Sequence, residues 1–600
     1  MSVLGKTLVE MFLNRVARTP DLVAFRHKTD GEWKPISFRE FGQMAREVAN
    51  GLISLGIGKG ENVSLLSKNR PEWHIADVGI MLAGGCTVPV YVTNSPPQVA
   101  YIVGHSESKV AIVEDLDQLE KILKTKEDVP DLQKVVVMTG EGVGDSDLVI
   151  SFDELRRLGR EFDQSSRGAL EERIASVSPD DLATIVYTSG TTGPPKGAML
   201  SHSNFAWTLD AIAKVLPFHD GAERVVSYLP LSHIFERLTS DWGGVFHGIE
   251  VWFAPSIDEL LPTLKECKPT FFIGVPRVYE KFYMGLKAQI QNHPKKDMIE
   301  RAVHAGTEKV ELEQSGKPVS LGLKLRYGLL NRLVLSRLRE GLGMENVKFA
   351  ITGAAAIQPE IIKFIHAIGI DLVEGYGQTE DNAPTSVNPP GKARIGTVGP
   401  PIPGLEVSFD EDGEILVRGA NVFQGYFKNP KATKETLTEE GWLRTGDVGE
   451  LDEAGYLRIT DRKKDLIKTA GGKYIAPAEI EGRLKFSPLI SQSVVIGEGR
   501  PFPVALLTLD PEVVPKWAKE QGIEFEDITE LPENEQVKQA VQKILDEVNA
   551  GLSQPEQIKK WALLSRDFTQ EAEEITPTLK VRRKTITEKY SDVIDKLYQK

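Results

Sequence analysis

Hydrophobic positions in the first half of the chain follow two alternating patterns. Between Glu32 and Gly274, short apolar runs have the length and composition of buried strands: ENVSLLSK, CTVPVYV, KVAIVED, KVVVM, TIVYT, RVVSYLP and FFIG. Segments such as ISFREFGQMAREVANGLISLG separate these runs and repeat apolar residues at the spacing of an amphipathic helix. Strands that alternate with helices in this way predict an α/β fold of layered sheets and helices.

Residues 285–343 have a different and mainly helical pattern. Apolar residues recur there at helical spacing among many basic ones: Leu325, Leu329, Leu330, Leu333, Val334 and Leu338 with Lys324, Arg326, Arg332, Arg337 and Arg339. We expect the apolar stripe to pack on the protein core and the charged side chains to face water. The alternative is that residues 323–340 form a basic amphipathic helix in peripheral contact with a membrane.

The composition changes after Asp461. The segment DRKKDLIKTAGGKYIAP leads into a polar and charged region with shorter helical and strand patterns. Such a change indicates a domain boundary. The sequence therefore predicts a large α/β domain followed by a small α+β domain, with the seam between Asp461 and Asp465.

Charge and cysteine content narrow the class of protein. The 600 residues carry a formal net charge of −14, which provides no basic field for a polyanion, so we expect no nucleic acid partner. Two cysteines, Cys86 and Cys267, are too few for a disulfide framework or a zinc cluster. The sequence has neither a secretory signal pattern nor an apolar run of membrane-spanning length. We expect a cytoplasmic protein, either a monomer or a homodimer, whose contact with a membrane would be peripheral.

The segment TIVYTSGTTGPPKG, residues 184–197, joins a predicted strand to a loop that suits phosphate groups. Hydroxyl groups, flexible glycines and one cation are concentrated there: Thr188, Ser189, Thr191, Thr192, Gly190, Gly193, Gly197 and Lys196. The loop is not a Walker A motif, because glycine follows Lys196 where that motif has a metal-binding hydroxyl. An ordinary surface turn rarely combines these residues directly after a strand. The sequence therefore predicts a nucleotide site.

Four further segments follow this loop along the chain. They are YLPLSHIFER at 228–237, TGAAA at 352–356, EGYGQTE at 374–380 and GWLRTGDVGELDEAGYLRITDRKK at 441–464. With the loop, they resemble the motifs of the adenylate-forming superfamily, which contains acyl-CoA synthetases, luciferases and the adenylation domains of peptide synthetases. LPLSHIFER and the last segment resemble those of long-chain fatty acyl-CoA synthetases. The resemblance extends over nearly the whole chain, from Asn69 to Arg583.

The resemblance implies a site for ATP and Mg²⁺. Thr188, Ser189, Gly190, Thr191, Thr192 and Lys196 would cradle the β- and γ-phosphates, and Thr188 and Glu380 would hold Mg²⁺ through oxygen ligands. Tyr376 would stack on adenine, in a segment that also contributes Gly377 and Thr379. Gly353, Ala354 and Ala355 would line the region of the adenine and the acyl carbonyl. Asp447 would hold the ribose hydroxyls, and Arg462 would reach the ribose or a phosphate.

The resemblance assigns His233 to a lid over the carboxylate pocket. The alternative is a packed or helix-capping histidine. We do not expect His233 to act as a general base, because a fatty carboxylate is already ionised at neutral pH. Four residues later, this chain has Arg237 where some long-chain members have a tryptophan.

By the same resemblance, Lys580 in TPTLKVRR would be the catalytic lysine of the small domain. Many members have Gly-Lys where this chain has Leu-Lys, and a solvated basic segment is the alternative. Lys464 would be the hinge residue. The implied organisation is an AMP-binding and acyl-binding domain over residues 1–461, a hinge over 462–465 and a mobile C-terminal domain over 466–600.

The function implied is that of an AMP-forming long-chain fatty acid–CoA ligase, which converts fatty acid, ATP and CoA into acyl-CoA, AMP and pyrophosphate through an acyl-adenylate. One alternative is an acyl-AMP ligase that loads a carrier protein, but AGGKYIAPAEIE at 470–481 resembles the loop that follows the hinge in CoA ligases. Another alternative is a non-catalytic acyl-binding protein on the same scaffold. This alternative is disfavoured because the chain retains the residues Lys196, Glu380, Asp447 and Arg462.

Overall fold

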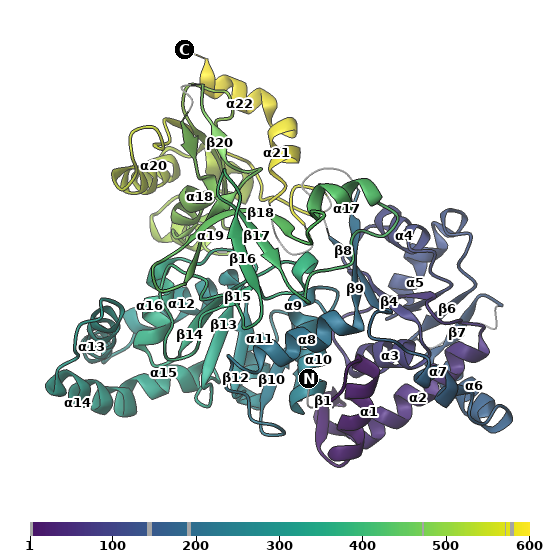
Figure 1. Cartoon of the computed structure of the whole chain (residues 1–600). Coiled ribbons are helices and arrows are strands. Elements are labelled where there is room, and N and C mark those ends of the chain that lie inside the picture. The colour runs from purple at the N-terminus through teal and green to yellow at the C-terminus, as the bar shows by residue number, and fades with distance from the viewer. Residues whose placement is uncertain are drawn as a thin grey trace.

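A seven-stranded sheet forms one side of the large N-terminal part in the computed structural model, which describes residues 4–140, 147–188, 194–470, 473–570, 572–576 and 581–599 (Figure 1). In spatial order its strands are β7 (Val149–Ser151), β6 (Lys134–Val137), β5 (Val110–Val113), β3 (Asn62–Leu66), β4 (Cys86–Pro89), β8 (Leu182–Thr188) and β9 (Lys196–Ser201). Only β9 in this sheet runs antiparallel to its neighbour. The predicted α/β fold is confirmed.

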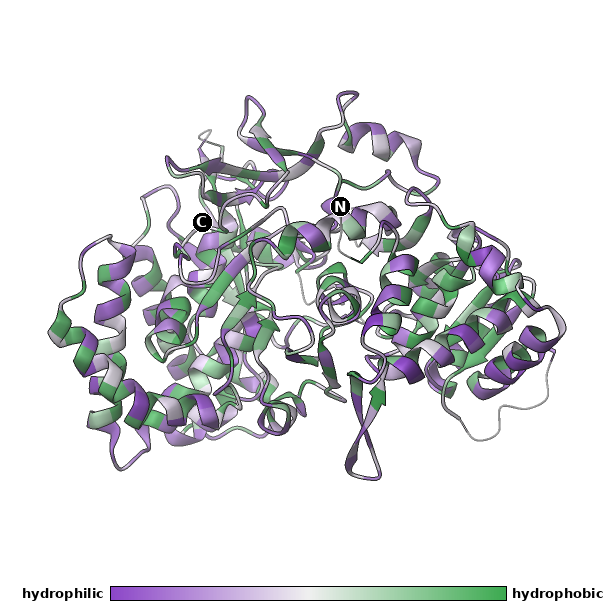
Figure 2. Cartoon of the chain, turned by 60° about the horizontal axis from the view of Figure 1, so that its bottom comes forward, coloured by the Kyte–Doolittle hydropathy of each residue, from purple (hydrophilic) through white to green (hydrophobic). Residues whose placement is uncertain are grey.

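Helices cover both faces of this sheet. Val110 and Ile112 of β5 join the core cluster of α2 (Phe38–Ser54) and α3 (Pro71–Leu82). The alternate residues Ala111 and Val113 join the cluster of α4 (Pro96–His105) and α5 (Leu116–Leu123). A strand buried on both faces reads as a continuous apolar run, which is why these strands are visible in the sequence. In Figure 2 hydrophobic colour runs along the strands, whereas the helices carry both colours.

Two four-stranded sheets occupy the middle of the molecule. One has the order β10 (Arg224–Ser227), β11 (Glu250–Phe253), β1 (Val23–Thr29) and β2 (Glu32–Ser37); the other has the order β12 (Phe271–Gly274), β13 (Phe349–Thr352), β14 (Leu372–Tyr376) and β15 (Ser386–Val387). Strand β14 continues to Tyr376, because Gly375 and Tyr376 pair with the short antiparallel strand β15.

A fourth, antiparallel sheet ends the N-terminal part, in the order β16 (Glu406–Phe409), β17 (Glu414–Arg418), β18 (Leu443–Leu451) and β19 (Leu457–Arg462). The remaining helices and helical turns of this part surround the sheets: α1 (Leu8–Arg18), η1 (Lys126–Asp128), α6 (Phe152–Ser165), α7 (Ala169–Ala175), α8 (His202–Ile212), α9 (Ile234–Glu236), η2 (Arg237–Asp241), α10 (Trp242–His247), α11 (Leu260–Cys267), α12 (Pro276–Gln291), α13 (Lys296–Gln314), α14 (Leu321–Leu330), η3 (Asn331–Leu335), α15 (Ser336–Gly341), α16 (Pro359–Ala367), η4 (Thr379–Asp381) and α17 (Pro430–Thr436).

The small C-terminal part has its own α+β architecture. Its elements are the hairpin β20 (Ile467–Lys468) and β21 (Tyr474–Ile475), the sheet β22 (Ile490–Ile496), β23 (Val504–Leu509) and β24 (Lys560–Leu563), and the helices α18 (Pro477–Lys485), α19 (Val514–Glu520), η5 (Ile528–Glu533), α20 (Glu535–Ala550), α21 (Arg583–Lys589) and α22 (Ser591–Tyr598). The buried clusters formed by residues from Ile467 onward are separate from those formed by residues up to Leu457. Each part therefore has its own core.

The apolar stripe expected between Leu325 and Leu338 divides into two faces. Val334 and Leu338 are buried and Leu330 packs against the core, whereas Leu325, Leu329 and Leu333 are exposed. The expectation that all six pack inward is therefore wrong. The two sets are offset by five residues, and at about 100° per residue this offset puts them on different sides of a helix. Within the described ranges, no helix is both long and apolar enough to cross a membrane.

Candidate active site

A cleft of about 2680 Å³ is lined by residues of both the N-terminal and the C-terminal part. Every residue of the predicted site that the structure describes lines this cleft: Thr188, Lys196, His233, Gly353, Ala354, Ala355, Tyr376, Gly377, Thr379, Glu380, Asp447, Arg462 and Lys464. Ser189, Gly190, Thr191, Thr192 and Lys580 lie outside the described residues. Segments far apart in the sequence thus meet on one surface.

Thr188 ends β8 and Lys196 begins β9, so the two residues border the predicted phosphate loop that connects these strands. The two residues are paired across the strands, and the Thr188 hydroxyl donates to the Lys196 carbonyl at 3.4 Å. The Lys196 ammonium lies 4.9 Å from the centre of the Tyr426 ring. A cation above an aromatic face is attracted by the ring, so this contact helps to hold the ammonium at the cleft.

A helix cap ties this hairpin to the segment that carries Tyr426. Ser201 ends β9 and caps α8. The backbone N–H of Asn204 donates to the Ser201 hydroxyl at 3.2 Å, and the backbone N–H of Ser201 donates to the Asn204 side-chain oxygen at 2.8 Å. The Asn204 side-chain amide also donates to the carbonyls of Ala420, at 2.7 Å, and Val422, at 3.1 Å. The two halves of the site therefore share one hydrogen-bonded frame.

Glu380 is a buried carboxylate with a fixed orientation. It lies in η4, and the Tyr426 hydroxyl donates to its Oε1 at 2.7 Å. The backbone N–H of Phe423 donates to the Glu380 carbonyl at 2.9 Å. Burial and the neighbouring carboxylate raise the pKa of Tyr426, so its hydroxyl remains a donor at neutral pH. The Glu380 carboxylate is thus presented to the cleft on the same side as Lys196.

Tyr376, Asp447 and Arg462 form a second hydrogen-bonded group. The Tyr376 hydroxyl donates to Asp447 Oδ2 at 2.7 Å, and Arg462 Nε lies 3.4 Å from Asp447 Oδ1. Strand pairing sets this geometry, since Asp447 of β18 is opposite Arg462 of β19. Burial, followed by the charge of Asp447, raises the pKa of Tyr376. Asp447 is nearly buried, whereas half of the Arg462 side chain is exposed.

The segment after β13 brings backbone, rather than side chains, to the cleft. A Cβ atom at Gly353 would lie 3.1 Å from the Gly375 carbonyl oxygen, so this close approach of two strand ends favours glycine. Ala354 has a φ of 70°, in the left-handed region that non-glycine residues seldom adopt. Residues 353–355 therefore bring closely packed, unusual backbone to the cleft.

One wall of the cleft is apolar. It is formed by α8 and its following segment, by η2 and by the strand ends, with Leu209, Ile212, Leu216, Leu238, Ile249, Ile351 and Val387 in its lining. Ile351 lies on β13 two residues before Gly353, so the apolar wall reaches the polar strand end. An apolar arm next to a polar centre suits a ligand with a hydrocarbon part and a charged head.

His233 caps a short helix and also lines the cleft. Its Nδ1 accepts from the N–H of Phe235 at 3.3 Å at the start of α9. Arg237, four residues later, does not line the cleft; it is fully buried and donates two hydrogen bonds to Asp77, at 2.6 and 2.7 Å. Burial raises the pKa of Asp77, and Arg237 opposes that rise. Arg237 is thus part of the core, while Phe235 and Leu238 beside it face the cleft.

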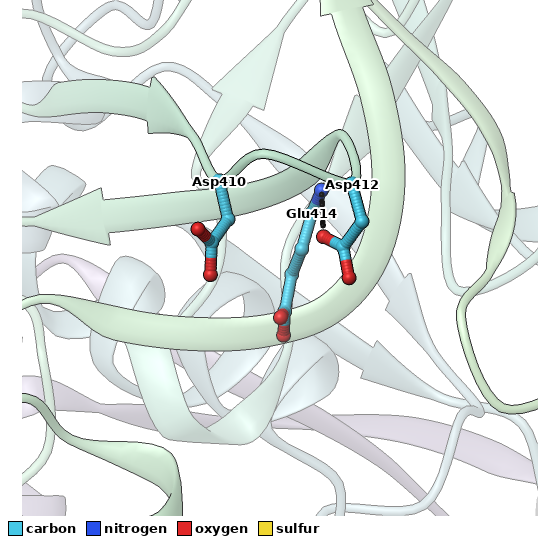
Figure 3. A group of neighbouring side chains, drawn as sticks. All are labelled: Asp410, Asp412 and Glu414. Atoms are coloured by element: carbon cyan, nitrogen blue, oxygen red, sulfur yellow. Dashed lines mark hydrogen bonds between the residues drawn. The ribbon is translucent and has the colours of Figure 1, made fainter.

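Three acidic residues near the seam could suggest a metal site. Asp410, Asp412 and Glu414 surround the turn between β16 and β17, with ligand atoms within 4.8 Å of one another (Figure 3). Cationic side chains are already paired with all three: Arg444 with Asp410 at 2.6 Å, and Lys463 with Asp412 and, at 2.9 Å, with Glu414. The cluster therefore anchors Lys463, at the start of the C-terminal part, to the fourth sheet.

Side chains of the two parts also contact one another across the cleft. Arg277 of α12 pairs with Asp510 of the C-terminal part at 3.0 Å. The rings of Tyr283 and Phe486 lie 5.8 Å apart. Gly482 faces Gln358, whose amide nitrogen would lie 2.6 Å from a Cβ at that glycine. These contacts fix the present arrangement of the two parts.

Sequence reasoning missed two residues of the cleft wall. Tyr426 positions Glu380 but belongs to none of the recognised motifs. Its separation from Glu380 along the chain does not predict that the two side chains meet. Glu374 belongs to EGYGQTE but had no predicted role; it lines the cleft, and burial raises its pKa to about 8. Glu374 is therefore mainly protonated at neutral pH. Only the strand pairing could have shown that it lies beside the apolar wall.

The chain matches the model of the AMP-binding enzyme family over residues 12–427 and that of the AMP-binding enzyme C-terminal domain over residues 464–600. It therefore belongs to the AMP-binding enzyme family. The fold is the adenylate-forming fold, with a large N-terminal and a small C-terminal domain.

Particular relatives extend over nearly the full chain. The long-chain-fatty-acid–CoA ligase FadD15 of Mycobacterium tuberculosis is 36% identical over 587 residues, which cover 97% of this chain and 95% of the relative. The long-chain-fatty-acid–CoA ligase ACSBG1 of Rattus norvegicus is 36% identical over 623 residues, covering 99% and 86%.

Two solved structures show the same fold at lower identity. The anthranilate CoA ligase AuaEII in complex with anthranoyl-AMP has a TM-score of 0.72 and 21% identity, with 99% of each chain covered. The A-PCP didomain of carboxylic acid reductase from Segniliparus rugosus in complex with AMP has a TM-score of 0.74 and 21% identity, with 99% of this chain and 82% of that chain covered.

Proposed function

We propose that this protein is an AMP-forming ligase that joins a long-chain fatty acid to CoA. The observation that carries the proposal is the meeting, in one cleft, of the predicted nucleotide residues and an apolar wall that ends beside Gly353. A long acyl chain can lie along that wall while its carboxylate reaches the polar strand end. The relatives with 36% identity bear the same activity in their names.

The reaction would proceed in two half-reactions. A carboxylate oxygen of the fatty acid attacks the α-phosphorus of ATP, the bond from that phosphorus to the β-phosphate bridging oxygen breaks, and pyrophosphate leaves. The CoA sulfur then attacks the acyl carbonyl and displaces AMP, and the thiol proton is released. The first step needs stabilisation of negative charge on phosphoryl oxygens more than covalent participation by the protein.

Lys196 would contribute its ammonium to the departing pyrophosphate, with the backbone of the adjoining loop. Asp447 would accept from the ribose hydroxyls and share its carboxylate with the Tyr376 hydroxyl, while Arg462 would reach the ribose or a phosphate. Tyr376 would stack on adenine beside Gly377 and Thr379. Residues 353–355 would line the adenine and the acyl carbonyl, where the close-packed strand ends leave backbone exposed to the ligand.

Thr188 and Glu380 would hold Mg²⁺. Both line the cleft, and a hydroxyl and a carboxylate are the hard oxygen ligands that this cation prefers. Tyr426 uses one Glu380 oxygen, Oε1, so the carboxylate is oriented with its second oxygen available as a ligand. When bound, the cation would offset the charge of the phosphate oxygens.

Two further residues complete the proposal. His233 would close over the carboxylate as a lid, and Lys580 would approach the α-phosphate during the first half-reaction. The assignment of Lys580 rests on its sequence and on two described neighbours, Thr576 and Val581, which both line the cleft. The domain boundary would lie at residues 462–465 with Lys464 as the hinge. We place the protein in the cytoplasm, where the two buried thiols would remain reduced.

One assay separates this function from its alternatives. The protein is incubated with ATP, Mg²⁺ and palmitate, and with either CoA or an acyl carrier protein, and AMP, pyrophosphate and thioester are measured. Palmitoyl-CoA with matching AMP and pyrophosphate is expected. Thioester on the carrier protein alone would identify an acyl-AMP ligase, and palmitate binding without pyrophosphate release would identify a non-catalytic acyl-binding protein.

A further inference from the structure

A row of four leucines on α14 and η3 faces solvent. Leu321, Leu325, Leu329 and Leu333, here called the leucine row, follow one another at intervals of four residues and are 79%, 75%, 61% and 58% exposed. Side chains four apart lie next to one another on a helix, so the four form one band. Single exposed leucines are ordinary on protein surfaces, but a contiguous band marks an interaction site.

The opposite side of the same segment is firmly packed. Val334, Leu335 and Leu338 are buried in the core shared with α12 and α16. The Arg339 guanidinium donates to the side-chain oxygen of Asn331 at 2.6 Å and to the Ile368 carbonyl. The leucine row is therefore held outward by a fixed helix.

The charge of this segment is opposite to that of the protein as a whole. From Lys317 to Arg339 the sequence contains six cationic residues and no acidic one, while the chain carries a net charge of −14. Lys324, Arg326, Arg332 and Arg337 are exposed like the leucines. In the adjacent α13, Glu313 pairs with Lys309 at 2.7 Å and Glu311 with Lys363 at 4.0 Å, while Glu308 is exposed. An apolar band flanked by exposed cations is complementary to an anionic interface.

We propose that the leucine row docks the protein on a membrane surface that contains anionic lipids. The leucine side chains enter the boundary between headgroups and acyl chains, and the four exposed cations contact lipid phosphates. The segment lies at the edge of the molecule, away from the C-terminal part (Figure 1). A second copy of the chain is a poorer occupant, because a two-fold interface would place these cations opposite one another. The proposal does not depend on the proposed catalytic function.

Vesicle sedimentation of the full-length protein, without substrates, tests the proposal. We expect binding to vesicles of phosphatidylcholine mixed with phosphatidylglycerol, weaker binding to phosphatidylcholine alone, and a decrease with added salt. The double variant Leu325→Gln/Leu329→Gln should bind about tenfold or more weakly, because two inserted apolar side chains are lost. The double variant Leu116→Gln/Leu123→Gln is the matched control, since these leucines are also exposed but lie on α5; it should bind like the unaltered protein.

A charge variant provides an independent readout. Lys324→Gln/Arg326→Gln should lose the preference for anionic vesicles while the thermal unfolding temperature is unchanged. The proposal is overturned if the unaltered protein does not sediment with anionic vesicles, or if the leucine variant sediments as well as the control. Sedimentation velocity without lipid tests whether the leucine row instead joins two copies of the chain. A larger species that disappears in the leucine variant would show such a contact and would also overturn the proposal.

Discussion

The two walls of the cleft are held in different ways. On the wall of the large domain, Glu380 and Asp447 are nearly buried, and each accepts a 2.7 Å hydrogen bond from a tyrosine hydroxyl. The wall of the small domain contacts the large domain through an ion pair between Asp510, whose side chain is 12% exposed, and Arg277, whose side chain is 30% exposed. The small domain also has its own core, separate from the cores of the large domain.

This difference indicates which wall sets the geometry and which can move. Buried, hydrogen-bonded carboxylates keep their positions before a ligand arrives, and such pre-organisation is what stabilises developing charge effectively. The described residues of the two domains form separate buried clusters, so a different arrangement of the small domain would leave both cores intact. We therefore expect substitutions in the fixed wall to impair binding of the nucleotide and metal, and substitutions in the movable wall to separate the two half-reactions.

The largest effect should come from Glu380. Glu380→Gln should reduce acyl-adenylate formation by about 10²–10³-fold, because a metal ligand is lost from a pre-organised site. Pyrophosphate release at saturating Mg²⁺ measures the effect. Tyr426→Phe is the control: it keeps the carboxylate and removes one hydrogen bond, so a loss of about tenfold or less is expected. Unchanged pyrophosphate release in Glu380→Gln would refute the assignment.

Lys580 should have a large effect on one half-reaction. Lys580→Ala should lower acyl-adenylate formation by about 10²-fold, the scale of losing one electrostatic stabiliser. Thioester formation from supplied acyl-adenylate should remain nearly unchanged, since no phosphoryl transfer occurs in that step. Lys584→Ala is the control for the alignment, because the exposed Lys584 also lines the cleft and pairs with Glu588 at 3.9 Å. The reverse result, with Lys584 essential and Lys580 dispensable, would show that the register is wrong.

Lys464→Pro should separate the half-reactions in the opposite sense. Lys463 is anchored to the fourth sheet through Glu414 and through its N–H, which donates to the Gly446 carbonyl at 2.9 Å, so we expect the proposed rotation to occur after this residue. Proline fixes φ at position 464 and should trap the adenylating arrangement. Pyrophosphate release should persist while thioester formation falls about tenfold or more. Lys464→Ala should leave both rates intact; equal loss of both rates in a folded Lys464→Pro protein would argue against a hinge.

The smallest effect should follow loss of the contact between the walls. Asp510→Asn removes the charge from the ion pair with Arg277 but keeps a side-chain oxygen as an acceptor, so the balance between the half-reactions should shift by no more than about fivefold. The ratio of the two single-turnover rates measures this shift. A loss above 10²-fold would mean that this wall is as rigid as the other one.

Much of the fixed wall, that of the large domain, could be predicted from the sequence, because each of its segments is continuous in the chain. A buried parallel strand reads as an apolar run, and the residues after its carboxyl end are close to it in sequence, as for Thr352 and Gly353. Contacts between such segments were not predictable from spacing. Tyr426 reaches Glu380 through the cap of α8, and β14 extends to Tyr376 only because β15 pairs with it. These contacts depend on tertiary packing.

The leucines of residues 321–338 show a different limitation. Their spacing indicated a helix, but the predicted stripe combined two faces of that helix. The angle between Leu329 and Val334, which are five residues apart, already separates the two faces. Which of the two faces meets the core could not be decided from the segment itself. The answer depends on α12 and α16, which bury Val334 and leave the leucine row outside.

Arg237 has a consequence for how this cleft could change in evolution or by design. Its guanidinium is fully buried between Asp77 and the rings of Trp73 and Phe205. Replacing it with the tryptophan of some long-chain relatives would leave the carboxylate of Asp77 without its cation, at a cost of about 3–5 kcal/mol. A new side chain at position 237 therefore requires compensating substitutions at several core positions at once. We expect single substitutions at Phe235 and Leu238 to be tolerated more readily, because these residues line the cleft and have no such buried ion pair.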